Sequence, residues 1–292
     1  MRTSLTWTAG MPAVFVLLWS TGFIGAKFGL PYAEPFTFLA LRFALLLVIL
    51  GIAVPALRAP WPSIRLAGHL AVSGLLVHAV YLVGVFGAIH RGVPSGLTAL
   101  IVGLQPLLTA VVVGPVLGER VTPRQWLGFL LGLAGVAMVL STRLTGISFS
   151  GFGWDGVVFA LAALLGITAG TLYQKRFCTG MDLRSGTLVQ YAAALVLLTP
   201  AALMFENLDI RWSWAFVFAL GWLVLVLSLG AIMLLMTLIR LGEAAKVASL
   251  FYLVPPVTAL MAFLLFDEAL NPLALMGMAT AAAGVALVVR RG

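Results

Sequence analysis

The chain has 292 residues, of which 62% are hydrophobic and 9% are charged, and its mean hydropathy is +1.15. A water-soluble protein carries about 25% charged residues, so this composition excludes an ordinary soluble domain and makes lipid the main solvent. The net charge of +8 does not indicate nucleic-acid binding, because the basic residues stand singly or in pairs beside apolar runs, where they act as topology signals. The single cysteine, Cys178, and three histidines without ligand spacing predict no disulfide framework, no metal site and no cofactor.

A helix that crosses the hydrocarbon core of a membrane needs about 20 apolar residues, and runs of about this length follow one another along the chain. The runs are continuously apolar, which excludes an outer-membrane barrel, whose strands alternate apolar and polar residues. The segments between the runs are too short for a soluble domain. We therefore predict an all-α integral membrane protein with spans 1 to 10 at residues 11–29, 35–56, 66–89, 94–117, 124–142, 154–174, 185–205, 213–239, 244–266 and 272–289.

Ten spans place both termini on the same side of the membrane. Most of the 17 Lys and Arg residues fall on that side, for example Arg58, Arg120 and Arg240. Because basic loops stay in the cytoplasm, we predict that both termini are cytoplasmic.

The two halves of the chain resemble each other at an offset of 149 residues, the distance from Pro106 to Pro255. Shared membrane composition explains matches of Ala and Val but not those of Pro, Glu and Gly in one register. These matches pair Pro106, Glu119, Pro123, Gly128 and Gly135 with Pro255, Glu268, Pro272, Gly277 and Gly284. Each half, residues 1–146 and residues 147–292, contains five spans. Since five is odd, the second half enters the membrane inverted, an architecture that recurs in secondary transporters.

Several short motifs carry a family resemblance: Trp19-Ser20-Thr21-Gly22-Phe23 in span 1, Leu41-Arg42-Phe43 in span 2, and the repeated tail with Leu117-Gly118-Glu119-Arg120 in one half and Phe266-Asp267-Glu268 in the other. On these residues the chain resembles the ten-helix EamA-type branch of the drug/metabolite transporter superfamily, and within it the exporters of aromatic and other neutral amino acids. The resemblance covers nearly the whole chain. It implies two EamA-type repeats, a location in the bacterial inner membrane, and a central cavity lined mainly by spans 1, 3, 4, 6, 8 and 9.

Polar and bulky aromatic residues inside apolar spans mark candidate substrate contacts, because such groups are costly in lipid unless they face a cavity or another helix. In span 3, His78 and Tyr81 are three residues apart and share a helix face. Together they can hydrogen-bond the carboxylate or ammonium group of a zwitterion. The alternative for His78 is a hydrogen bond to a carbonyl of a neighbouring helix.

Spans 4 and 9 carry prolines at equivalent positions. A proline frees a carbonyl about four residues upstream, and helix interruptions at matching places in two inverted halves indicate a binding site. The alternative is that these prolines only bend the helices. The predicted contacts are Ser95, Thr98 and Gln105 beside Pro106 in span 4, and Ser249 and Tyr252 beside Pro255 and Pro256 in span 9.

Three further residues are candidate substrate contacts. Trp19 lies in the middle of span 1 rather than at an interface, where tryptophans normally anchor. Thr168 in span 6 and Ser228 in span 8 add hydroxyl groups at membrane depth.

Arg42, Glu119 and Glu268 are expected to have structural or gating roles. Arg42 lies several residues inside span 2, from where its long side chain can extend part of the way back to the outer boundary of the membrane. We therefore expect a structural or gating role for Arg42 ahead of substrate binding. Glu119 and Glu268 end spans 4 and 9, where they pair with or cap the following helix. Mid-membrane Asp and Glu are absent from the sequence, so proton coupling through His78, coupling through another group and no coupling all remain open.

The sequence thus predicts an inner-membrane exporter that moves aromatic and other neutral amino acids by alternating access, without a chemical step. Another metabolite or a drug as substrate is the alternative on the same fold. A channel or an intramembrane enzyme is a weaker alternative, because no triad, H-E-x-x-H motif or buried carboxylate pair is present. Small-residue pairs such as Gly128 and Gly132 predict close helix contacts inside one bundle, so a monomer suffices and an oligomer is not required.

Overall fold

The computed structural model describes residues 4–93, 95–144, 153–266 and 271–289. This part of the chain is a bundle of helices with a single isolated β-bridge between Ala33 and Ile210. The helices are α1 Ser4–Gly29, α2 Pro35–Ala56, α3 Ile64–Gly74, η1 Leu75–Val80, α4 Tyr81–His90, α5 Ser95–Val102, α6 Gln105–Leu117, α7 Pro123–Leu144, α8 Trp154–Phe177, α9 Leu183–Phe205, α10 Trp214–Trp222, η2 Leu223–Ala231, α11 Ile232–Leu241, α12 Ala244–Ser249, η3 Leu250–Leu253, α13 Val254–Phe266 and α14 Pro272–Val289.

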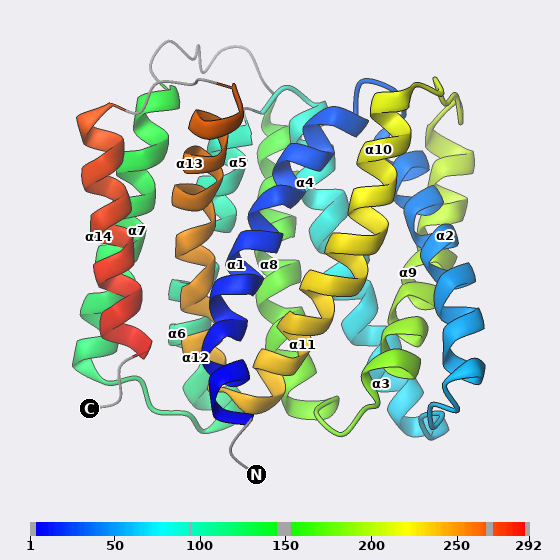
Figure 1. The fold of residues 1–292 in the computed structure, drawn as a ribbon, viewed down its shortest axis with the longest axis horizontal. Helices are drawn as coiled ribbons and strands as arrows, with labels where there is room; N and C mark the ends of the chain where they lie inside the picture. The colour runs from blue at the N-terminus through cyan, green and yellow to red at the C-terminus, as the bar shows by residue number, and fades with distance from the viewer. Residues whose placement is uncertain (1–3, 94, 145–152, 267–270, 290–292) are drawn as a thin grey trace.

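The prediction of an all-helical membrane protein is confirmed, since nine of the described helical stretches are long and apolar enough to cross a membrane. For span 1 the corresponding stretch, Gly10–Gly22, is shorter, although α1 itself runs the length of the bundle (Figure 1). Helix α1 begins and α14 ends at the same end of the bundle (Figure 1). We call this end the terminal end; the cytoplasmic orientation of the termini remains a prediction.

Local sequence signals set where the helices begin. Pro35 occupies the first turn of α2, where its missing N–H costs nothing. Ser213 caps α10 by accepting the N–H of Phe216 at 3.1 Å. Asp182 caps α9 by accepting the N–H of Arg184 at 2.9 Å, and its hydrogen bonds from Arg184 hold the pKa of this carboxyl below its ordinary value.

The contacts between helices have the symmetry expected of two equivalent, inverted halves. Span 1 (α1) packs against span 8 (α10 and η2) and span 9 (α13). Its counterpart, span 6 (α8), packs against span 3 (η1 and α4) and span 4 (α5 and α6). Spans 2 and 7 (α2 and α9) pack on each other, as do spans 5 and 10 (α7 and α14). When each span is replaced by its counterpart in the other half, each of these contacts therefore becomes another observed contact or stays the same.

Glycines hold α7 and α14 at backbone distance. A Cβ on Gly128 would lie 2.6 Å from the carbonyl oxygen of Gly284, and a Cβ on Gly135 would lie 2.5 Å from that of Gly277. The predicted close contact of Gly128 inside one bundle is therefore confirmed. A larger residue at either position would force α7 and α14 apart.

Two pairs of irregular turns obey the same offset. The π-helical η1 of span 3, moved by 149 residues, falls on residues 224–229, inside the π-helical η2 of span 8. The break between α5 and α6 at residues 103–104 falls on residues 252–253, inside the 3₁₀ turn η3 of span 9. Both irregularities are thus properties of the repeat.

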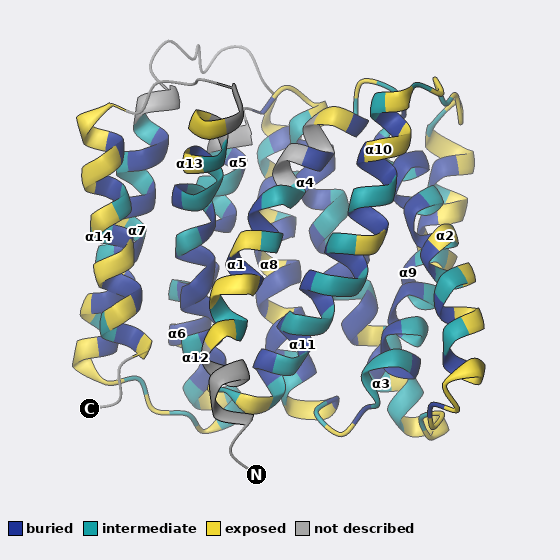
Figure 2. Cartoon of the chain, in the orientation of Figure 1, coloured by how far each residue is buried: buried dark blue, intermediate teal, exposed yellow. Residues whose placement is uncertain are grey.

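The burial pattern fits a bundle in lipid. Exposed side chains face outwards on the outer helices, whereas buried side chains lie between helices (Figure 2). The exposed faces carry large apolar groups, including Val48, Leu165 and Val196, which is unfavourable in water and suits lipid. At the end opposite the terminal end, Glu206 joins the two halves by accepting the N–H groups of Phe36 and Thr37, each at 2.7 Å.

Candidate functional site

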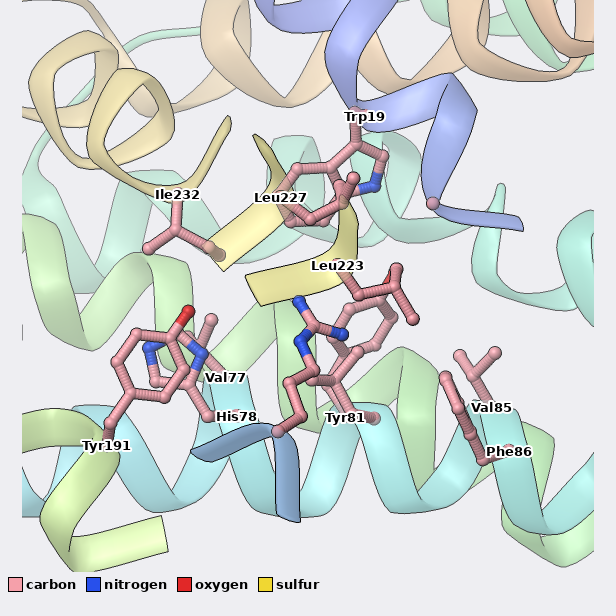
Figure 3. Close-up of a pocket in the computed structure, with 13 residues that line it drawn as sticks. Trp19, Val77, His78, Tyr81, Val85, Phe86, Tyr191, Leu223, Leu227 and Ile232 are labelled. Atoms are coloured by element: carbon pink, nitrogen blue, oxygen red, sulfur yellow. The ribbon is translucent and has the colours of Figure 1, made fainter. Parts of the chain in front are cut away.

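A cavity lies among helices of both halves, with about 570 Å³ of empty space when its opening is included. Tyr191 and His78 lie together on one side of it, and Val85 and Phe86 lie on the other (Figure 3). The lining is mainly aromatic and aliphatic, with few polar groups. The full set is Trp19, Gly22, Arg42, Val77, His78, Tyr81, Leu82, Val85, Phe86, Tyr191, Leu223, Leu227 and Ile232.

Arg42, Ser228 and Tyr191 form the polar centre of this cavity. The Nε of Arg42 donates a hydrogen bond to the hydroxyl of Ser228 at 2.9 Å. The hydroxyl of Tyr191 donates to the carbonyl oxygen of Ser228 at 3.3 Å. Ser228 belongs to the π-helical η2, so this wider turn orients both a guanidinium and a phenol.

Aromatic contacts fix the remaining walls. The ring of His78 stacks on Tyr191 with centroids 4.1 Å apart, and neither of its nitrogens has a hydrogen-bond partner among the described residues. Trp19 stacks on Tyr81 at 6.4 Å and meets Phe251 of η3 edge to face at 5.2 Å. Trp19 therefore lies between the cavity and the helix interruption of span 9.

The structure brings Trp19, His78 and Tyr81 together as predicted side chains of one cavity, and it places Ser228 directly behind Arg42. It corrects the lining that the family resemblance implies. Spans 2 and 7 contribute Arg42 and Tyr191, whereas spans 4, 6 and 9 contribute none of the described lining residues. Arg42, expected to have a structural or gating role, faces the cavity itself.

Of the predicted contacts of spans 4 and 9, the described side chains of Thr98, Gln105, Ser249 and Tyr252 do not line this cavity. The break in span 4 precedes Pro106, and the 3₁₀ turn of span 9 precedes Pro255 and Pro256. Around these turns, Thr98, Gln105 and Tyr252 are buried, and the Thr98 hydroxyl, both amide atoms of Gln105 and the Tyr252 hydroxyl have no hydrogen-bond partner in the described part of the chain.

Two other predicted contacts are occupied within their own helices. Thr168 donates to the carbonyl of Leu164 at 2.7 Å, and Ser249 donates to that of Lys246 at 2.7 Å. A hydroxyl bonded back to its own helix needs no ligand.

The two glutamates and Ser95 complete the set of predicted residues. Glu119 accepts the N–H of Ala244 at 3.0 Å and so caps α12, the first helix of span 9, rather than the helix that follows it in the chain. Glu268 and the side chain of Ser95 lie outside the described residues.

Tyr191 was not among the residues predicted from the sequence. A signal for it was present, because Tyr191 is 149 residues after Arg42 and therefore occupies the equivalent position of the second half. The same offset pairs His78 with Leu227, and all four of these residues line the cavity. Applying the repeat to each polar residue would have identified it.

The lining of the cavity suits the binding of a small molecule that has a polar and an apolar part. Its polar groups are a guanidinium, an imidazole, two phenols and the indole N–H of Trp19, and no described group of His, Cys, Asp or Glu has the arrangement of a metal site. Such a set can hydrogen-bond a small polar group while the aromatic walls hold an apolar one.

A model of the EamA-like transporter family matches the chain twice, over residues 7–141 and 154–290. The chain is 30% identical to the "Uncharacterized inner membrane transporter YedA" of Escherichia coli strain K12, over 94% of this chain and 89% of that protein. It is also 30% identical to the "Probable terminal-alkyne amino-acid exporter" of Streptantibioticus cattleyicolor, over 99% of this chain and 91% of that protein. A solved crystal structure shares the fold with a TM-score of 0.76 at 23% identity, over 96% of this chain and 95% of that chain. The chain therefore belongs to the EamA-like transporter family and is a multi-span membrane transporter.

Proposed function

We propose that this protein exports aromatic and other neutral amino acids across the bacterial inner membrane by alternating access. The observation that carries the proposal is the cavity among helices of both halves, whose aromatic walls surround a small polar centre. A side chain of variable size fits the apolar part, and the constant polar part of an amino acid fits the polar centre. The names of the two relatives, an amino-acid exporter and an inner-membrane transporter, support the same substrate class and location.

In this proposal the terminal end faces the cytoplasm, and the halves 1–146 and 147–292 exchange conformations to open the cavity to either side. Trp19, His78, Tyr81 and Tyr191 contact the substrate in the state described above. Thr98, Gln105 and Tyr252, whose polar groups have no hydrogen-bond partner among the described residues, contact it in a state in which spans 4 and 9 have moved. An unpaired buried polar group costs about 1–3 kcal/mol, so a second state that satisfies these groups offsets that cost.

Counterflow of labelled phenylalanine into liposomes that contain only the purified protein tests the proposal, with and without an imposed pH gradient. We expect saturable exchange that unlabelled neutral amino acids abolish. The response to the gradient separates proton-coupled from uncoupled transport. Folded protein that exchanges no neutral amino acid would move the assignment to another metabolite on the same fold.

Alanine at Trp19, His78 or Tyr81 should lower the exchange rate by about tenfold or more, since each removes a wall or a hydrogen-bonding group of the cavity. Matched controls are Trp61→Ala and His90→Ala, which change exposed side chains and should leave exchange intact. Unchanged rates for all three cavity variants would refute the site assignment.

A further inference from the structure

Arg42 carries a full charge into the interior of the bundle. Only 4% of the residue is exposed, and it lines the cavity. Its Nε donates to Ser228, but the described residues supply no hydrogen-bond acceptor to its two terminal nitrogens. A guanidinium has five N–H donors in a rigid fork, so most of its hydrogen-bonding capacity is directed at the cavity.

None of the described carboxylates forms an ion pair with Arg42. Asp155 pairs with Arg91, Asp182 with Arg184, and Glu243 with Lys246. The remaining ones, Glu34, Glu119, Glu206 and Asp209, lie in loops or at helix ends. A buried cation inside a membrane protein is costly without an anionic partner.

We infer that Arg42 binds the carboxylate of the transported molecule and thereby makes the site selective for small carboxylates with an apolar side chain over the corresponding amines. The inference rests on the proposed transport function and deepens it. The transported anion is the counter-ion that the protein itself does not provide. Arginine is suited to this role because its planar fork matches the two oxygens of a carboxylate.

The hydrogen bonds around Arg42 define the geometry of this contact. Because Ser228 occupies Nε and is itself tied to Tyr191, the orientation of the guanidinium plane is restricted. The carboxylate then binds end-on to the two terminal nitrogens. Neutral aromatic side chains surround this contact, since Phe43 lies 6.0 Å from the guanidinium carbon and Tyr81 and Tyr191 line the same cavity.

The site is asymmetric in charge although it lies between two equivalent halves. Arg42 and Tyr191 occupy equivalent positions of the two halves and face one cavity, but only Arg42 is charged. A substrate therefore has one favoured orientation, with its carboxylate towards span 2. Its ammonium group, where it has one, lies away from Arg42, where His78 and the phenol oxygens can accept a hydrogen bond.

Competition for binding of labelled phenylalanine to the purified protein in detergent tests the inference without a variant. The competitors share a phenyl side chain and differ at one end: phenylalanine has both charged groups, 3-phenylpropionate lacks the ammonium group, and phenylalaninamide lacks the carboxylate. We expect 3-phenylpropionate to compete and phenylalaninamide to bind about 10- to 100-fold more weakly than phenylalanine, as loss of a charge-assisted hydrogen-bond pair predicts. Equal or better competition by phenylalaninamide would overturn the binding of the carboxylate by Arg42 and would leave amino-acid export standing.

Two variants locate the selectivity at Arg42. Arg42→Gln should weaken phenylalanine binding about 10- to 100-fold and leave phenylalaninamide binding unchanged, which erases the difference between them. Arg42→Lys should restore part of the difference, because it keeps the charge but not the fork. Arg65→Gln, an exposed site in the first turn of α3, is the matched control. A structural role alone would weaken both ligands equally, and that result would refute the inference.

Thermal stabilisation of the purified protein by matched carboxylates and amines with other side chains separates the two proposals. Stabilisation by carboxylates such as 3-phenylpropionate, with none by any neutral amino acid, would overturn amino-acid export and support the role of Arg42. Stabilisation by amines alone, or by no member of either series, would overturn both.

Discussion

Spans 3 and 8, which carry the π-helical turns, differ from spans 4 and 9, which carry the proline breaks, in how they use buried polar groups. In η2 of span 8, Ser228 bonds both Arg42 and Tyr191 at the edge of the cavity. In spans 4 and 9, the side chains of Gln105 and Tyr252 are buried without a hydrogen-bond partner among the described residues, and they do not line the cavity. A proline break in a helix therefore marks a place where buried polar groups lie close together. A π-helical turn marks a place where such groups lie at the cavity.

The largest effect should come from two serines that differ in this respect. Ser228→Ala removes the partner of the Arg42 Nε, and we expect phenylalanine affinity to fall about tenfold or more, since a hydrogen bond to a charged group contributes about 1.5–3 kcal/mol. Ser249→Ala removes only a bond to its own helix and should leave affinity within about twofold. Equilibrium binding measures both. If the two variants behave alike, the distinction between the two pairs of spans fails.

Two glutamines should change stability in opposite directions. Gln190 donates to Gln174 at 2.8 Å and to Ser73 at 3.3 Å, so Gln190→Met should lower the free energy of unfolding by about 1–2 kcal/mol. Both amide atoms of Gln105 lack partners among the described residues, so Gln105→Met should raise it by about 1 kcal/mol or more. Thermal unfolding in detergent reports the sign. A stabilised Gln105→Met protein that also turns over more slowly would support a role for Gln105 in a second state.

The smallest effect should come from the cap between spans 4 and 9. Glu119→Gln keeps an acceptor for the N–H of Ala244 but removes the charge at the start of α12, so we expect a loss of about 0.3–1 kcal/mol. Glu243→Gln, which breaks an exposed pair with Lys246, is the control and should have less effect. Thermal unfolding checks both variants, and a loss well above this range would mean that Glu119 does more than cap a helix.

The fold was largely predictable because its signals are local. Apolar runs separated by prolines and charges gave boundaries such as 35–56 and 272–289, which the helices α2 and α14 reproduce. The proline positions in spans 4 and 9 likewise lie beside the observed interruptions. These signals need only the residues of one segment and the cost of bringing backbone polar groups into lipid.

The site was less predictable because it depends on how helices from both halves pack. Trp19, His78 and Tyr81 could be selected by depth and helix face, yet the same criteria also selected Thr168, whose hydroxyl bonds its own helix. Arg42 was identified as unusual, but only the packing of spans 2, 7 and 8 turns it towards a cavity. The π-helical turns leave no residue pattern comparable to a proline.

The matching π-helical turns also bear on the history of the chain. A π-helical turn fits more residues into a stretch of helix than a regular helix does, and both halves have one at the same place in their third span. A single ancestral half that already carried the turn, then doubled, accounts for both with one event. Later divergence at one pair of positions, Arg42 and Tyr191, is then enough to convert two equivalent walls into a cavity with a charged side and a neutral side.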